Sequence, residues 1–274
     1  MRFAIKLIIL SLVILSYNFA HAEEKEICKA CFLEWGKQGG KDLPDQGFNP
    51  DLVSTVLREA GYEPKVDIIP WKRCLALVKS HKYDFVAGYW RGKEGDKYYD
   101  YLRPTTIDKI TFIVLKDSPC KSGKMEDMYG KRVGYLENAG GLETFRNNEN
   151  KFETIPVSGD KALLRMLKNH RIDAIVSNSQ HITSLAEIEF PDLASKLRVL
   201  SPPIQINITS AAISWTHPKR EEIKRRYNKA YDKLVAEGLY ERLMKKHGLK
   251  VGYKLDDLDL LSGSTSKDGN ADNL

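Results

Sequence analysis

The most informative hydrophobic pattern in the chain occurs twice. Residues 75–87 read LALVKSHKYDFVA, and residues 164–176 read LRMLKNHRIDAIV. In each segment, apolar residues at helical spacing give way to a short polar turn with a histidine, and an aspartate then opens a buried strand. The pattern predicts the same helix–turn–strand unit twice, and therefore two α/β lobes of similar build. A cleft between such lobes is a common place for a small ligand.

Strands and helices are predicted to alternate along most of the chain. Asn49 and Pro50 predict a helix start, as N-cap and first helical residue, and Gly61 predicts its end. Pro70 predicts the start of the next helix, and residues 89–103 are expected to form a loop. Alternation of this kind indicates a parallel sheet. Strands are predicted at 26–33, 66–69, 84–88, 109–115, 132–136 and 204–215, and C-terminal helices at 218–237 and up to 248.

Both ends of the chain differ from the middle. Arg2 and Lys6 flank the start of an apolar run at 7–15, and Ala20-His21-Ala22 follows, which is the pattern of a secretory signal peptide over residues 1–22. The run is short for a membrane span. We therefore expect cleavage after Ala22 and a soluble, exported protein, with an uncleaved anchor helix as the alternative. Residues 251–274 are polar and are predicted to be partly disordered.

Charge adds little to this picture. The formal net charge is +6 for the whole chain, about +4 without residues 1–22, and about +7 for residues 23–250 alone. A mild basic excess is compatible with an anionic ligand, but it is more often a solvated face. The sequence has no basic stripe with interleaved aromatic residues, so nucleic-acid binding is not expected.

The four cysteines predict at least one disulfide, because disulfides form in exported proteins. Cys28 and Cys31 have CxxC spacing, but they lie on a predicted strand, where residues three apart point to opposite faces. We therefore expect no bridge between them, and neither a redox nor a zinc site. Pairing with Cys74 or Cys120 is expected, and both pairings remain open.

Six short segments, taken together in order and spacing, match a known family. From residue 27 to residue 248 the chain resembles the periplasmic solute-binding proteins of family 3, which include the polar-amino-acid binders of ABC importers. The matching segments are GFNPDL at 47–52, PWKR at 70–73, YDFVAG at 83–88, YDYLRP at 99–104, GKRVG at 130–134 and AEGLY at 236–240.

The resemblance implies an α/β fold with two lobes, of the periplasmic-binding-protein-like type II, with a central cleft and two crossing hinge strands. Lobe 1 would comprise residues 23–115 and 208–250, and lobe 2 residues 116–207. The crossing strands would be 109–115 and 204–215. In such proteins the ligand is trapped as the lobes close about the hinge.

The resemblance also implies a function. We expect a monomeric periplasmic receptor that captures a small polar solute, amino-acid-like or related, for a separate inner-membrane ABC permease. No cofactor, metal ion or catalytic residue is expected. A periplasmic ligand sensor and, less favoured, a dehydratase-like enzyme on the same fold are the alternatives. The sequence has no phosphate-binding loop, nucleophile elbow or HExxH motif, and Glu34 and Glu137 are interpreted as solvated glutamates.

Candidate ligand-binding residues lie where predicted strands end, because open α/β sheets bind ligands there. Trp35 follows the first strand, where the family often places a ring that stacks on the ligand. Trp71 has the alternative role of packing a helix on the sheet, and Arg73 that of pairing with a surface carboxylate. Only one of the adjacent Tyr89 and Trp90 is expected to face the cleft. The full set is Trp35, Trp71, Arg73, Tyr89, Trp90, Arg91, Glu137, Asn138 and Asn178.

Two positions depart from the family pattern. The usual binders have Thr-Pro-Glu-Arg, whose arginine binds the α-carboxylate of the ligand, and that position here holds Gly95. The aspartate that accepts the α-ammonium falls at Asn178. We therefore expect weak or no binding of common α-amino acids, and instead another polar or aromatic solute, held by Arg73 or Arg91 and stacked on Trp35 or Trp71. Arg91 taking over the carboxylate is the alternative.

Overall fold

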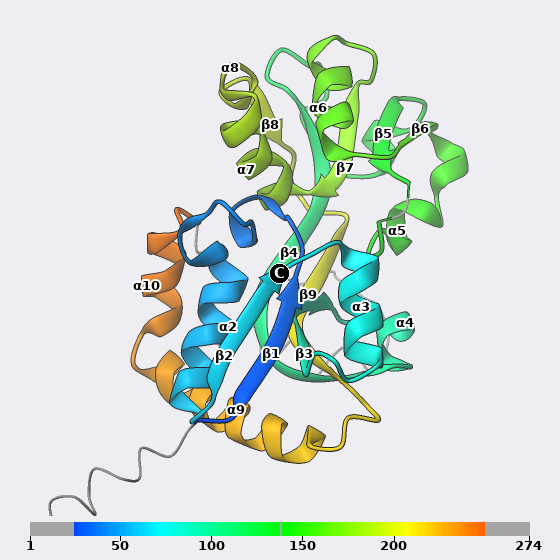
Figure 1. Cartoon of the computed structure of the whole chain (residues 1–274). Coiled ribbons are helices and arrows are strands. Elements are labelled where there is room, and N and C mark those ends of the chain that lie inside the picture. The colour runs from blue at the N-terminus through cyan, green and yellow to red at the C-terminus, as the bar shows by residue number, and fades with distance from the viewer. Residues whose placement is uncertain (1–24, 138, 250–274) are drawn as a thin grey trace, which may run out of the picture.

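The computed structural model describes residues 25–137 and 139–249. The predicted signal peptide, the predicted disordered tail and Asn138 lie outside these described residues. The described chain forms one nine-stranded sheet with the order β2-β1-β3-β9-β4-β7-β5-β6, and β8 pairs with β4. Helices cover both faces of this sheet in two lobes (Figure 1). No helix in the described ranges has the length and apolar character needed to cross a membrane.

The first lobe is built on three parallel strands. Strand β1 lies between β2 and β3 and pairs with both. One face of these strands carries α2, α9 and α10, and the other carries α3 and α4 (Figure 1). The bounds are β1 (Ile27–Phe32), β2 (Glu63–Ile68), β3 (Phe85–Trp90), α2 (Phe48–Glu59), α3 (Trp71–Lys79), α4 (Lys93–Asp96), α9 (Arg220–Ala236), α10 (Leu239–Lys246), and the short helices η1 (Gly36–Gln38) and η2 (Pro44–Gln46).

The second lobe repeats this plan. Strand β5 pairs in parallel with β6 and β7. The bounds are β5 (Arg132–Leu136), β6 (Glu153–Val157), β7 (Ala174–Asn178), β8 (Leu197–Val199), α5 (Glu143–Arg146), α6 (Asp160–Lys168), α7 (Ser179–Glu189), α8 (Pro191–Ala194), and the short helices η3 (Glu126–Met128) and η4 (Glu149–Lys151).

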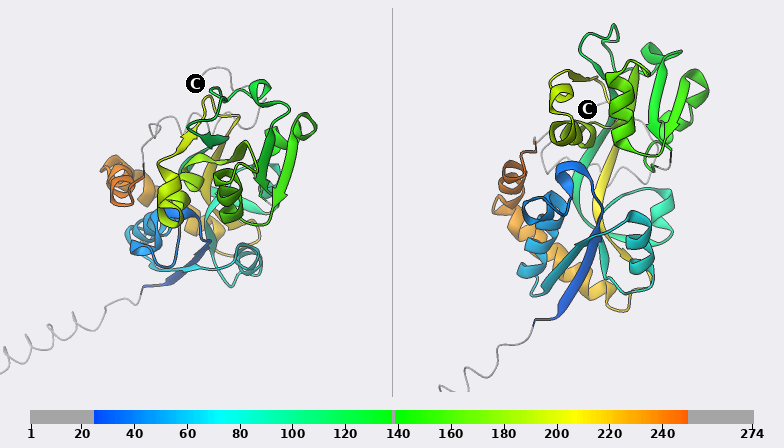
Figure 2. Two further views of the ribbon diagram at one scale, coloured as in Figure 1. Left: turned by 90° about the horizontal axis from the view of Figure 1, so that it is seen from above. Right: turned by 45° about the horizontal axis from the view of Figure 1, so that its top comes forward.

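Two long antiparallel strands, β4 (Tyr99–Leu115) and β9 (Gln205–Ser214), join the lobes (Figure 2). The prediction that residues 89–103 form a loop is wrong in part, because β4 begins at Tyr99 rather than at Lys109. Its first residues pair with Ala212–Ser214 of β9. The ladder is irregular around Pro104, which has no N–H to donate. This stretch contains polar residues and a proline, so its sequence does not predict a strand.

The hydrophobic cores follow the two lobes. Phe48, Leu52 and Tyr227 pack together in the first lobe. Ile110, Phe112 and Val114 pack instead with residues of the second lobe, among them Val133 and Phe145. The predicted lobe limits stay a prediction. On this packing we propose that the first limit lies before Ile110 rather than after Leu115.

The repeated segment has a structural cause. In both lobes the turn histidine adopts a left-handed backbone, with φ of 57° at His81 and 53° at His170. In both lobes the aspartate that follows bonds to the backbone of the neighbouring strand. Asp84 Oδ2 accepts from Lys29 N at 2.6 Å, and Asp173 Oδ2 accepts from Arg132 N at 2.9 Å. The same helix–turn–strand unit, with its aspartate bonded to the neighbouring strand, therefore occurs once in each lobe.

The start of α2 differs from the prediction. The helix begins at Phe48, with Gly47 at its N-cap, so Asn49 is not the capping residue. Asn49 lies in the first turn, fully buried, and neither atom of its amide has a hydrogen-bond partner among the described residues. The predicted end of the helix agrees better with the structure. Gly61 directly follows the C-cap residue Ala60 and has φ of 86°.

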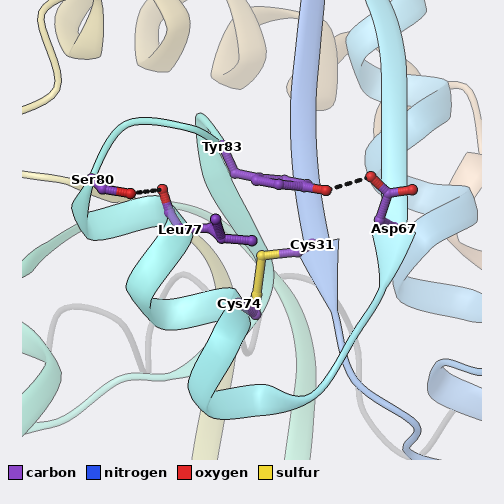
Figure 3. Close-up of a disulfide and its surroundings, with 6 residues drawn as sticks. All are labelled: Cys31, Asp67, Cys74, Leu77, Ser80 and Tyr83. Atoms are coloured by element: carbon purple, nitrogen blue, oxygen red, sulfur yellow. Dashed lines mark hydrogen bonds between the residues drawn. A yellow bond between two sulfur atoms is a disulfide. The ribbon is translucent and has the colours of Figure 1, made fainter.

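The predicted disulfide is confirmed, and it joins Cys31 of β1 to Cys74 of α3 (Figure 3). The absence of a Cys28–Cys31 bridge is confirmed as well. Cys31 faces α3, whereas Cys28 packs in the core beneath α2, and burial raises the pKa of the Cys28 thiol. In the described part of the chain, Cys28 and Cys120 are free thiols.

Candidate ligand-binding site between the lobes

The lobes contact each other through the segment that follows β1. The ring of Trp35 lies flat against the imidazole of His181 at the start of α7, with ring centroids 3.7 Å apart and planes 8° apart. Gln38 Nε2 donates to Gln180 Oε1 at 3.2 Å. Gly36 has φ of 52°, and a Cβ there would lie 3.1 Å from that of Ser184. A glycine at this position therefore lets the segment approach α7 closely.

A buried carboxylate, Asp108, lies beneath this contact in the middle of β4 and is 1% exposed. Its Oδ1 accepts from Gln38 Nε2 at 3.2 Å and from Thr106 Oγ1 at 3.5 Å. Its Oδ2 accepts from Trp90 Nε1 and from Thr209 Oγ1. All four donors are neutral. No positively charged side chain of the described residues therefore pairs with Asp108 in the region where the lobes meet.

Trp90 connects Asp108 to both lobes. Its ring meets Trp35 edge to face, with centroids 5.8 Å apart. On the second lobe it packs against Gly141, where φ is 68° and a Cβ would lie 2.2 Å from Trp90 Cε3. Asn207 Nδ2 donates to the carbonyl of the same glycine at 2.9 Å. Only a residue without a side chain lets this loop close on the indole.

Several polar atoms around the contact are buried without a hydrogen-bond partner among the described residues. Asn178 uses Oδ1 to cap α7, accepting from His181 N at 2.9 Å, and its Nδ2 is unpaired. The ring nitrogens of His181 make no well-oriented hydrogen bond, although Nε2 lies 3.2 Å from Asp160 Oδ2. The unpaired amide of Asn49 lies beside Gly88. Buried polar atoms usually bond to protein, water or ligand.

Four predicted site residues lie elsewhere in the first lobe. Tyr89 packs on Trp71, with ring centroids 5.5 Å apart. Arg91 donates from Nε to Ser210 Oγ at 2.8 Å and from Nη2 to the Leu102 carbonyl at 3.1 Å. Neighbouring strand residues point to opposite faces, so Trp90 lies between the lobes while Tyr89 and Arg91 face α3 and α4. Arg73 is exposed on α3.

The remaining predicted positions are quickly placed. Glu137 is exposed in the loop after β5, and Asn138 lies outside the described residues. The structure thus brings three of the predicted residues, Trp35, Trp90 and Asn178, to one place. Their role in binding stays a prediction.

Gly95, which replaces the arginine of the family pattern, is enclosed by tyrosines. A Cβ added there would lie 2.1 Å from Tyr101 Oη and 2.7 Å from Tyr89 Cε1. The site therefore has no room for a long side chain without rearrangement of both rings.

The sequence analysis missed the polar residues that line this contact, namely Gln38, Asp108, Gln180, His181 and Thr209. Two signals were present. Asp108 is an acidic residue directly before the apolar strand segment at 109–115, and His181 follows Asn178 by three residues in the first turn of a helix. Their meeting depends on strand pairing and lobe packing, which local periodicity does not report.

Comparison with known proteins agrees with this architecture. The probable histidine-binding protein of Campylobacter jejuni is 25% identical over 209 residues, covering 74% of this chain and 77% of that protein. The cystine-binding protein TcyJ of Escherichia coli is 27% identical over 138 residues, covering 50% of this chain and 52% of that protein.

A solved structure is similar as well. The arginine-, lysine-, histidine-binding protein ArtJ of Geobacillus stearothermophilus superposes with a TM-score of 0.67 at 21% identity, covering 86% of this chain and all of that one. The family model for bacterial extracellular solute-binding proteins, family 3, matches residues 41–250. The chain belongs to this family, with its type II two-lobe fold.

Proposed function

We propose that this protein is a periplasmic receptor that captures a small polar solute between its lobes and delivers it to a separate ABC permease. The observation that carries the proposal is the group of Trp35, Trp90 and His181 around the buried Asp108, at the place where strands of both lobes end. Such a place combines aromatic surface with a few convergent polar groups, as ligand sites do.

On binding, contacts between the solute and the lobes would replace the direct contact between Trp35 and His181. Trp35 belongs to the first lobe and His181 to the second, so separation of the lobes exposes the face of each ring. A solute that stacks on Trp35 and touches the second lobe favours the closed arrangement, which is a shift of population toward closure. The hinge is the pair β4 and β9, the strands that cross between the lobes.

The first experiment identifies the solute and locates its site. Mass spectrometry of protein purified without denaturation identifies the bound compound, and calorimetry then measures its affinity. We expect Trp35→Ala to weaken binding about tenfold through loss of stacking. Trp71→Ala is the matched control, because Trp71 also follows a strand end but packs against Tyr89 on the other face.

Three outcomes count against the proposal. An equal loss in both tryptophan variants would place the site elsewhere. Chemical turnover of the bound compound would favour the enzyme alternative. Unchanged uptake of labelled solute by cells that lack this chain would favour the sensor.

Specificity is a separate question. The relatives named above are described as binders of histidine, cystine or arginine. For this protein, in contrast, we expect weak or no binding of common α-amino acids, for the following reasons. Gly95 leaves no room for an arginine, Arg91 bonds to Ser210 on the other face, and Asn178 is neutral. An unpaired charge in a closing cleft costs several kcal/mol, enough to abolish micromolar binding.

Calorimetry against the twenty amino acids tests this expectation. We expect no submicromolar binding. A submicromolar amino acid that still binds Arg91→Ala would refute both the expectation and the alternative in which Arg91 holds the carboxylate.

A further inference from the structure

The described residues bury three acidic side chains almost completely, and one of them has no basic partner. Asp100 pairs with Arg220 and Lys224 at 2.6 Å and 2.5 Å. Asp51 pairs with Lys246 and His247 at 2.6 Å and 2.9 Å. Asp108, the most buried of the three, has no lysine, arginine or histidine of the described chain within ion-pair distance. A buried charge is costly unless it is paired.

The hydrogen bonds to Asp108 stabilise its charge but do not neutralise it. Gln38, Thr106, Trp90 and Thr209 are all neutral donors. The two contacts to Oδ1 are the long ones, at 3.2 Å and 3.5 Å. Oδ1 is therefore the atom at which an added cation gains most, since a charge-assisted hydrogen bond is about twice as strong as a neutral one.

The surroundings of Asp108 also suit a cation. Trp90 donates to it directly, and Trp35 lies against Trp90. Indole faces attract ammonium groups and are the best aromatic partners for them. The face of Trp35 that now lies on His181 would become available when the lobes separate.

Basic groups near the contact are engaged elsewhere. Lys37 pairs with Glu187, and the His181 imidazole faces Asp160. Arg91 bonds to Ser210 and to the Leu102 carbonyl on the opposite face of the sheet. Among the residues that the structure describes, the site therefore offers the carboxylate of Asp108 for a cation, but no positively charged side chain that is committed to a carboxylate.

We propose that the solute is an organic amine without a carboxylate group, bound with its ammonium group at Asp108 and its apolar part on Trp35. This inference rests on the proposed receptor function and adds the chemical class of the solute. It reverses the expectation that Arg73 or Arg91 grips the ligand.

Matched compounds test the inference on the unmodified protein. Calorimetry compares four amines with the amino acids that carry the same side chain: histamine with histidine, agmatine with arginine, cadaverine with lysine, and phenethylamine with phenylalanine. 2-Phenylethanol replaces the ammonium of phenethylamine by a neutral hydroxyl. We expect at least one amine to bind at least about tenfold more tightly than its amino acid, and 2-phenylethanol not to bind.

The inference is overturned if no amine of the panel binds, if the amino acids bind as tightly as the amines, or if the alcohol matches phenethylamine. None of these results removes the receptor function, because the solute found by mass spectrometry would then be of another class. The receptor function is instead refuted by the outcomes described above: equal loss of binding in both tryptophan variants, chemical turnover of the bound compound, or unchanged uptake in cells that lack this chain.

The variant Asp108→Asn tests the residue. Asparagine keeps one oxygen as an acceptor for Gln38 and Thr106 but removes the charge, so binding of the amine should fall at least about tenfold. Asp67→Asn is the control, because Asp67 accepts a hydrogen bond from Tyr83 Oη outside the cleft (Figure 3). Retained affinity in Asp108→Asn overturns the assignment. Should that variant fail to fold, the amine–alcohol comparison on the unmodified protein decides.

Discussion

At the scale of single residues, the paired aspartates Asp84 and Asp173 show how one side chain can organise a strand. Each carboxylate accepts a hydrogen bond from the backbone of the strand beside it. Asp173 also receives Arg132 in an ion pair at 2.6 Å. The hydrogen bond and charge of Arg132 hold the pKa of the Asp173 carboxyl below its ordinary value.

The lowered pKa of Asp173 sets the direction of a pH effect. A carboxyl with a lower pKa in the folded state contributes stability above about pH 4, and this contribution is lost as the pH falls further. We expect Asp173→Asn to lower the free energy of unfolding at pH 7 by about 1 kcal/mol, a modest value because the carboxylate is partly exposed.

Urea unfolding at pH 7, 5 and 3 measures this effect. The unmodified protein should lose more stability between pH 5 and pH 3 than Asp173→Asn does. The exposed Asp42→Asn is the control and should follow the unmodified protein. Identical pH profiles for all three proteins would show that the interactions of the Asp173 carboxylate contribute no stability to the fold.

At the scale of secondary structure, the disulfide holds a short helix to the sheet. Helix α3 has nine residues and no side-chain cap at its start, so packing and the bond from Cys74 to Cys31 of β1 hold it in place. The bond closes a loop with a sequence separation of 43. In the chain-entropy account a loop of this size stabilises by about 4 kcal/mol, and disulfides typically contribute about 2–4 kcal/mol.

We therefore expect Cys74→Ser to lower the free energy of unfolding by about 2–4 kcal/mol and to speed hydrogen exchange in α3. Cys120→Ser, which alters a free and partly exposed thiol, should have little effect. Dithiothreitol should reproduce the loss in the unmodified protein and change nothing further in Cys74→Ser. A stability that resists both treatments would mean that packing alone secures the helix.

At the scale of the whole molecule, the Trp35–His181 stack is a contact between the lobes that a hinge motion must break. We expect His181→Ala to shift the solute-free protein toward open conformations, because the ring contact and its buried area are lost. Small-angle scattering should show a larger radius of gyration than for the unmodified protein, and tryptophan emission should change. His170→Ala, at an exposed turn of the second lobe, is the control.

Solute should bring both proteins to the same compact particle if the lobes close on it. Should a tight solute change neither scattering nor fluorescence, the hinge does not operate in this protein.

Local patterns in the sequence determined much of the fold. The repeated segment predicted the helix–turn–strand unit of each lobe, and the alternation of a strand placed Cys28 and Cys31 on opposite faces, as observed. The strand at 132–136 has the predicted bounds. These features depend on residues a few positions apart, whose periodicity reports directly which face is buried.

Only the tertiary structure decided features that join distant segments. Cys31 finds Cys74 rather than Cys120 because α3 packs beside β1. Trp90, rather than Tyr89, reaches the second lobe because β3 presents that face to it. Within the described residues, Asp108 lacks a basic partner because the four side chains that converge on it, from three strands and η1, are all neutral. Whether a solute meets an unpaired carboxylate at Asp108 depends on how distant segments of the chain pack together. A local sequence pattern cannot predict this.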